Sequence, residues 1–175
     1  PQGRITHQCL GLYDQETEDA LRRVVSFCRQ YGQAKLGIQL AHAGRKASAR
    51  TPIHGGTALQ ESENPWETIA PSALAFADGW HIPKSMNEED LVKVKSEFVE
   101  SARRAVHLGF DVIELHAAHG YLLNQFTSPL SNHRADEYGG KELSKRLAYP
   151  LEVFDAIKEV VPKRIALGAR ISGTD

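Results

Sequence analysis

Cysteine, long apolar runs and net charge are all scarce in this sequence. Cys9 and Cys28 lie far apart and form no Cys-x-x-Cys pair, so the sequence indicates neither a zinc ribbon nor a disulfide framework. No apolar run approaches the roughly 20 residues that a membrane-spanning helix needs. A net charge of −1 offers nucleic acid no electrostatic attraction. We therefore expect free thiols, a cytoplasmic protein, no membrane association and no nucleic-acid partner.

The composition that is present is typical of an ordinary globular domain. Hydrophobic residues make up 41% and charged residues 25% of the 175 residues, which excludes a disordered or polyionic chain. A chain of this length can bury about two thirds of its surface, so 1–175 is expected to form a single domain. The chain starts at Pro1 without a methionine and stops at Asp175, directly after an expected strand. We expect it to be an internal piece of a longer protein.

Three short runs rich in β-branched residues predict strands at 36–40, 112–115 and 165–171. Helical patterns separate them, and this alternation predicts a parallel sheet covered by helices. Periodicity alone leaves both an open doubly wound sheet and a barrel available. The segment 45–86 is long, polar and rich in Gly, Pro and Ser, as is typical of a functional loop.

Three helices are expected, and residues near their ends predict their boundaries. The first ends near Gly32, which is expected in the left-handed conformation that often closes a helix. Asn87 followed by Asp90 resembles a capping box and predicts the start of the second helix. The third spans about 143–161, and Pro150 inside it predicts either a kink or a start near that proline.

The strongest chemical signal is a group of ring side chains after the strand at 112–115. His116, His119 and Tyr121 follow it closely, and in parallel α/β folds this end of a strand faces the ligand. If the chain turns helically there, a spacing of three puts both imidazoles on one side. The two could then hold one oxygen atom together.

Three interpretations of the histidine pair stay open. A zinc site would need a further ligand, and we expect Glu114 on the opposite face of the strand from His116. Buried histidines bonded to backbone carbonyls are a second interpretation, although two histidines and Tyr121 in one run make it weaker. In the third, His116 and His119 donate hydrogen bonds to a carbonyl or anionic oxygen, and Tyr121 carries a proton.

Several long motifs resemble the Old Yellow Enzyme family, and more narrowly its bacterial YqjM and xenobiotic reductase branch. The motifs cover nearly the whole chain in consistent order: Gly37 to Lys46, Trp66 to Ser72, His116 to Tyr121, Ser128 to Arg134, and Asp136 to Gly140. The resemblance implies a partial (β/α)8 TIM barrel that binds FMN, with this chain supplying strands three to five and their helices. The N- and C-terminal barrel strands would lie outside it.

The resemblance also implies roles for five residues. His116 and His119 match the pair that binds the carbonyl oxygen of an α,β-unsaturated substrate, and Tyr121 matches the acid that protonates its α-carbon. Gln39 matches a residue that pairs with the flavin pyrimidine edge. Arg170 matches the arginine beside flavin N1, where a permanent positive charge would favour the reduced, anionic flavin. An arginine within an apolar strand is itself unusual, because a buried charge needs a partner.

The implied activity is that of an ene-reductase, which passes hydride from NAD(P)H through FMN to an activated C=C bond. Alternatives are a metal-dependent barrel hydrolase with His116 and His119 as ligands, or a non-catalytic barrel fragment. The family's phosphate loops follow strands seven and eight, so the isolated chain should be inactive and bind FMN weakly or not at all. The substrate, the choice of NADH or NADPH, and a homo-oligomer in the full-length enzyme stay open.

Other residues receive lesser roles. His42, Arg45 and Lys46 follow the first expected strand and could either reach the site or shape the loop. The run that contains Asn132 and Arg134, with Asp136 and Tyr138, is expected to be architectural, with side chains bonded to the loop after the strand at 112–115.

Overall fold

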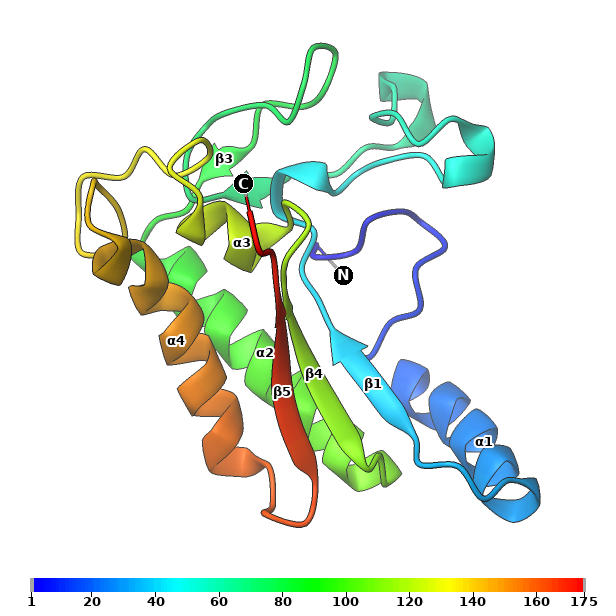
Figure 1. Ribbon diagram of the computed structural model, residues 1–175. Helices are drawn as coiled ribbons and strands as arrows, with labels where there is room; N and C mark the ends of the chain where they lie inside the picture. Colours follow the sequence, from blue (N-terminus) through cyan, green and yellow to red (C-terminus); the bar gives the residue numbers. More distant parts are fainter. Residues whose placement is uncertain (1, 175) are drawn as a thin grey trace.

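The described chain, residues 2–174 of the computed structural model, is built on a three-stranded parallel sheet (Figure 1). Strands β1 (Gly37–Leu40), β4 (Val112–Ala117) and β5 (Ala166–Ile171) are hydrogen-bonded in the order β1-β4-β5. Both pairings are parallel. The predicted strands and the parallel sheet are confirmed, with strand ends shifted by a residue or two.

Long helices alternate with these strands. They are α1 (Gln15–Tyr31), α2 (Glu88–Leu108) and α4 (Leu143–Val160), and a short helix α3 (Leu122–Thr127) follows β4. Figure 1 shows α2 and α4 along one side of the sheet. Each of the β1-α2-β4 and β4-α4-β5 units therefore connects neighbouring parallel strands through a helix, as barrels and doubly wound sheets do.

The start of α2 and the end of α1 lie where the sequence predicts, but Gly32 has a different conformation from the one expected. Asn87 caps α2, and the capping box with Asp90 is complete, as predicted. Gly32 is not left-handed: its φ is −115°, so the chain leaves α1 in an extended conformation. Its N–H still bonds the Cys28 carbonyl, and a Cβ at Gly32 would lie 2.7 Å from that oxygen. A glycine at this position therefore allows close contact with the Cys28 carbonyl, and it does not provide a left-handed residue that ends the helix.

Helix α4 neither starts nor stops at Pro150. It begins at Leu143 and continues through the proline, so the expected start near Pro150 is wrong. Tertiary contacts hold the preceding turns: Tyr149 is buried and donates to the Leu91 carbonyl at 2.9 Å, and Arg146 donates to the Thr127 carbonyl at 2.8 Å. These contacts stabilise a helix that Pro150 alone would interrupt.

The side of the sheet that packs on the helices is apolar. Leu40, Ile113 and Leu115 point to it, and each is 5% exposed or less. They belong to one core cluster with Phe98 of α2 and Val153 of α4. Burial of these side chains stabilises the fold by about 1.5–3 kcal/mol each.

The opposite side of the sheet, called here the open face, carries polar residues. Gln39 lies opposite Glu114 in the strand register, and His116 lies opposite Arg170. Because residues two apart on a strand share a face, Glu114 and His116 lie on the same side. The expectation that Glu114 points away from His116 is therefore wrong. It misapplied the two-residue period of a strand.

The segment between β1 and α2 forms an excursion above the sheet (Figure 1). It contains three single-turn 3-10 helices, η1 (Gly44–Lys46), η2 (Pro52–His54) and η3 (Glu61–Glu63). Two short parallel strands follow, β2 (Ile69–Ala70) and β3 (Lys84–Ser85). This excursion lies at the carboxyl ends of the sheet strands, where the chemical motif was expected.

Candidate active site

The loops that follow the three strands are tied together at their carboxyl ends. The backbone N–H of His119, after β4, donates to the Ser172 hydroxyl, after β5, at 3.0 Å. The Leu122 N–H donates to the His42 carbonyl, after β1, at 2.9 Å. The turn between β4 and α3 is therefore held from both sides by the neighbouring strands' loops.

This turn brings three rings together. The ring centroids of His116 and His119 are 5.2 Å apart, and those of His116 and Tyr121 are 5.0 Å apart. The pair does not meet through a helical turn, because His119 has φ of 58° and α3 starts only after Tyr121. A left-handed residue at the strand end brings the second imidazole back to the first, so the predicted convergence arises by a different backbone path.

His116 is a neutral hydrogen-bond donor in this arrangement. The Ala118 N–H donates to its Nδ1 at 3.2 Å, so the proton of the neutral ring is on Nε2. Burial lowers the pKa of His116 below its usual value, and neighbouring His119 lowers it further. At neutral pH the ring therefore presents one N–H without a positive charge.

Tyr121 keeps its proton as well. Burial raises the pKa of its phenol above the usual value, so the hydroxyl stays protonated at neutral pH. The side chain is only partly buried, and its ring packs edge-on against that of His116. A protonated phenol beside a neutral imidazole can give its proton to a bound molecule.

Two buried amides brace the turn, and the sequence reasoning missed both. The Asn124 side chain accepts from the Gly120 N–H at 2.7 Å, and the Gln125 amide donates to the Gly120 carbonyl at 2.7 Å and the Ala43 carbonyl at 3.2 Å. Gly44 has φ of 60°, and a Cβ there would collide with the Gln125 amide. Two amides within the otherwise apolar run Leu122–Thr127 were the available signal.

Gln39 and Arg170 lie on the open face near these rings. The Gln39 amide donates to Glu114 Oε1 at 2.5 Å, which leaves its own oxygen as a free acceptor. Arg170 is exposed, and within residues 2–174 it has no hydrogen bond or ion pair. An amide acceptor and an unpaired cation suit the polar edge of a flavin ring.

Comparisons with known proteins identify the family. The sequence profile of the NADH:flavin oxidoreductase / NADH oxidase family matches residues 1–175. The chain belongs to this family. An NADPH dehydrogenase of Geobacillus thermodenitrificans is 46% identical over 175 residues, covering 100% of this chain and 46% of that protein. An NADPH dehydrogenase of Bacillus subtilis is 43% identical over 160 residues, covering 91% and 42%.

Solved structures agree with the partial-barrel prediction. A morphinone reductase in complex with tetrahydroNAD has a TM-score of 0.78 and 30% identity, covering 98% of this chain and 48% of that one. An Old Yellow Enzyme from Pichia has a TM-score of 0.75 and 29% identity, covering 91% and 41%. The predicted resemblance to the Old Yellow Enzyme family and the barrel fold class are confirmed. The chain spans less than half the length of the curated relatives named above.

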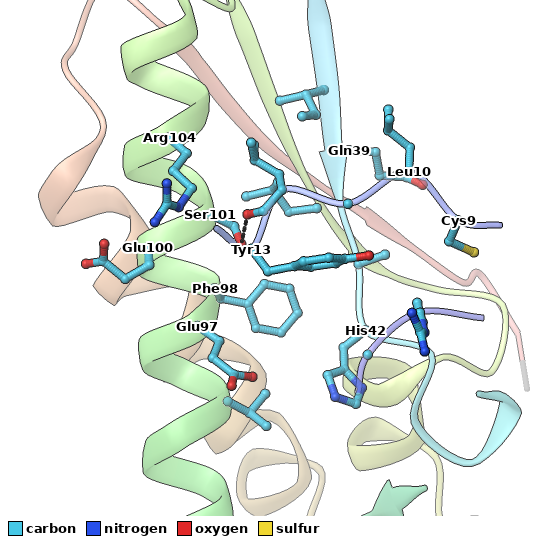
Figure 2. Close-up of a pocket in the computed structure, with 18 of the residues that line it drawn as sticks. Cys9, Leu10, Tyr13, Gln39, His42, Glu97, Phe98, Glu100, Ser101 and Arg104 are labelled. Atoms are coloured by element: carbon cyan, nitrogen blue, oxygen red, sulfur yellow. Dashed lines mark hydrogen bonds between the residues drawn. The ribbon is translucent and has the colours of Figure 1, made fainter. Parts of the chain in front are cut away.

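One cavity of the described chain lies along the edge of β1. Its volume is about 560 Å³, and five consecutive residues, 38–42, line it together with Tyr13 and Phe98 (Figure 2). Consecutive residues point to alternate faces, so the cavity runs along the edge of β1, where no sheet strand is paired within residues 2–174. His116, His119, Tyr121 and Arg170 do not line it. The ring cluster is therefore the candidate site, and of Gln39 and Arg170 only Gln39 also lines the cavity.

The described residues offer no complete metal site. Within residues 2–174 no three His, Cys, Asp or Glu side chains are grouped as metal ligands would be. His116 and His119 therefore have no third ligand from the described part of the chain. In that same part, no helix has the length and apolar character needed to cross a membrane.

The motif after α3 is architectural, as expected. The Asn132 amide donates to the Phe126 and Tyr138 carbonyls, both at 2.7 Å. Arg134 is paired with Asp136 and donates to the Met86 carbonyl at 2.6 Å. These bonds fix the loop before α4, and the bond from Arg134 joins this loop to the residue that follows β3.

Proposed function

We propose that residues 1–175 supply strands three to five of one FMN-binding (β/α)8 barrel domain. In the complete protein this domain passes hydride from NAD(P)H to the C=C bond of an α,β-unsaturated carbonyl compound. The observation that carries the proposal is the ring cluster: a neutral His116 N–H, His119 and a protonated Tyr121 at the carboxyl ends of the strands. The names of the curated relatives, NADPH dehydrogenases, support the hydride source.

The two histidines act on the substrate carbonyl oxygen. Hydrogen bonds from His116 Nε2 and from His119 draw electron density toward that oxygen, and the β-carbon becomes electrophilic. Negative charge develops on the oxygen when hydride adds, so donors fixed at that position stabilise the transition state more than the ground state. Because burial lowers the pKa of His116, the imidazole stays neutral at neutral pH and donates its single Nε2–H to the substrate oxygen.

Tyr121 supplies the proton that completes the reduction. The phenol gives its proton to the α-carbon as hydride reaches the β-carbon, and solvent then reprotonates the phenolate. Proton transfer by a positioned side chain contributes typically about 10²–10⁴-fold to the rate. The raised pKa of Tyr121 keeps the acid form fully populated at neutral pH.

The open face provides the side chains that would hold the cofactor. FMN, when bound, supplies hydride transfer between the nicotinamide and the alkene. The free oxygen of Gln39 would accept from the pyrimidine edge, because its amide nitrogen is already engaged by Glu114. Arg170 would place a permanent positive charge where reduction adds negative charge to the ring. We expect the isolated 175-residue chain to bind FMN weakly, since the family's phosphate loops lie outside it.

A His119→Ala variant of the complete protein tests this function. We expect binding of 2-cyclohexenone and phenol to weaken about 10-fold or more, because one of two donors to the oxygen is lost. Reduction of the bound flavin by NADPH should be largely unchanged. His107→Ala, an exposed histidine of α2, is the matched control and should change neither. Equal losses in both half-reactions would contradict the assigned role.

A further inference from the structure

Lys46 reaches from the loop after β1 to the turn after β4. It is the last residue of η1, and its Nζ donates to the His119 carbonyl at 3.0 Å. The N–H of the same histidine donates to Ser172 after β5. Both backbone polar groups of His119 are thus held by loops from the two neighbouring strands, and Lys46 is one of the two ties.

The same ammonium group lies over two aromatic rings. Lys46 Nζ is 4.8 Å from the ring centroid of Tyr121 and 4.8 Å from that of Phe76. A cation within about 6 Å of a ring centroid is attracted by the ring electrons. The attraction to Tyr121 grows when its phenol loses a proton, because part of the negative charge spreads into the ring.

The backbone conformation at this turn needs external support. His119 has φ of 58°, a region that costs free energy for a residue with a side chain. The following residue, Gly120, also has positive φ, and a glycine imposes no backbone conformation on its neighbour. The positive φ of His119 therefore depends on contacts from outside the turn. The bond from Lys46 to the His119 carbonyl therefore stabilises the one backbone arrangement that brings His119 toward His116.

We propose that Lys46 is a positioning residue that fixes the His119–Tyr121 turn and stabilises the phenolate that Tyr121 forms when it gives up its proton. The inference rests on the proposed function, since it assigns Lys46 a part in proton delivery by Tyr121. Lys46 connects the loop after β1 to the turn after β4 that carries Tyr121. Loss of Lys46 should affect the alkene step and leave the flavin step intact.

The test uses the complete, flavin-loaded protein and three lysine variants. Lys46→Met keeps the apolar stem but removes the donor and the charge, and Lys46→Arg keeps both. Lys158→Met, on the exposed side of α4, is the matched control. We expect Lys46→Met to slow 2-cyclohexenone reduction about 10-fold while NADPH reduces the flavin at an unchanged rate. Lys46→Arg should restore most of the loss, and Lys158→Met should have no effect.

A double-mutant cycle with Tyr121→Phe separates positioning from general damage. If Lys46 acts through Tyr121, adding Lys46→Met to Tyr121→Phe costs much less than about 10-fold, because the two act as a unit. The pH profile of alkene reduction in Lys46→Met should also shift toward higher pH, as the phenolate loses its cation. Full additivity with an unchanged pH profile would overturn the inference. If Lys46→Met fails to fold, Lys46→Gln is put through the same cycle.

The same cycle distinguishes failure of the inference from failure of the function. If Tyr121→Phe slows alkene reduction and Lys46→Met does not, the positioning role is wrong and the proposed function stands. If Tyr121→Phe leaves alkene reduction unchanged, the proton-donor role and the inference built on it are both overturned.

Discussion

The two faces of the parallel sheet differ in kind although they alternate along the same strands. On the helix side, Ile113 and Leu115 are buried in the core. On the open face, Gln39 and Arg170 are exposed, and Glu114 accepts a hydrogen bond from Gln39. Because side chains alternate along a strand, the residues that stabilise this fold lie on one face of the sheet and those that can bind a cofactor lie on the other.

The same period couples the two faces. A slip of one residue in the register would move every apolar side chain to the open face and every polar one into the core. The packing of Ile113 and its neighbours therefore also fixes where His116 and Arg170 lie. In this region stability and placement of the candidate site have one physical cause, while the chemistry of each side chain is independent of the core.

The largest expected effect comes from the helix side. Ile113→Ala should lower the free energy of unfolding by about 2–5 kcal/mol, because it leaves a cavity in a fully buried position. Val92→Ala, on the outer side of α2 and 60% exposed, is the control and should cost about 1 kcal/mol or less. Urea unfolding of the complete protein measures both. Similar losses of stability at the two positions would contradict the claim that the helix side of the sheet stabilises the fold.

A smaller effect is expected from pH, through His42 at the start of the loop after β1. Burial lowers the pKa of His42 from 6.5 to about 3. The unfolded chain therefore takes up a proton near pH 6.5 that the folded protein refuses until about pH 3. Stability is fully present above pH 6.5 and falls as the pH decreases across this window, by at most about 1.4 kcal/mol per pH unit from this group.

Urea unfolding of wild type and His42→Gln between pH 7 and 4 measures that contribution. The variant should lose stability less steeply as the pH falls, whatever its stability at pH 7. His42 Nε2 has no hydrogen-bond partner within the described residues, so the substitution breaks only the bond from the Gly44 N–H. Identical slopes for the two proteins would show that His42 is not the group that titrates.

The smallest effect on stability is expected on the open face. Arg170→Met should lower the free energy of unfolding of the flavin-free protein much less than Ile113→Ala does, because within residues 2–174 the guanidinium makes no hydrogen bond or ion pair on which the fold depends. The same variant should retain less FMN than wild type after gel filtration. A loss of stability as large as that of Ile113→Ala would mean that Arg170 supports the fold.

Much of the framework could be predicted from the sequence. The three strands, their parallel order and the capping box at Asn87 follow from local patterns, and those patterns agree with the tertiary contacts. The shared face of Glu114 and His116 was predictable too, since it depends only on a spacing of two residues. The end of α1 before Gly32 and the extent of α4 were predicted as well, but the conformation of Gly32 was not, and neither was the unbroken passage of α4 through Pro150, which contacts distant in sequence support.

The detailed site could be predicted only in part. That His116, His119 and Tyr121 converge was foreseeable from their position after a strand. The left-handed conformation of His119 was not, because Ser172 and Lys46, each more than 50 residues away, hold it.

The most direct test of the central claim is the cofactor content of the complete purified protein. Its visible absorption spectrum is recorded, and any chromophore released by denaturation is identified and quantified against protein. We predict one FMN per chain, held in part by Gln39 and Arg170 on the open face. A colourless protein that releases no flavin would contradict the account and remove the role assigned to that face.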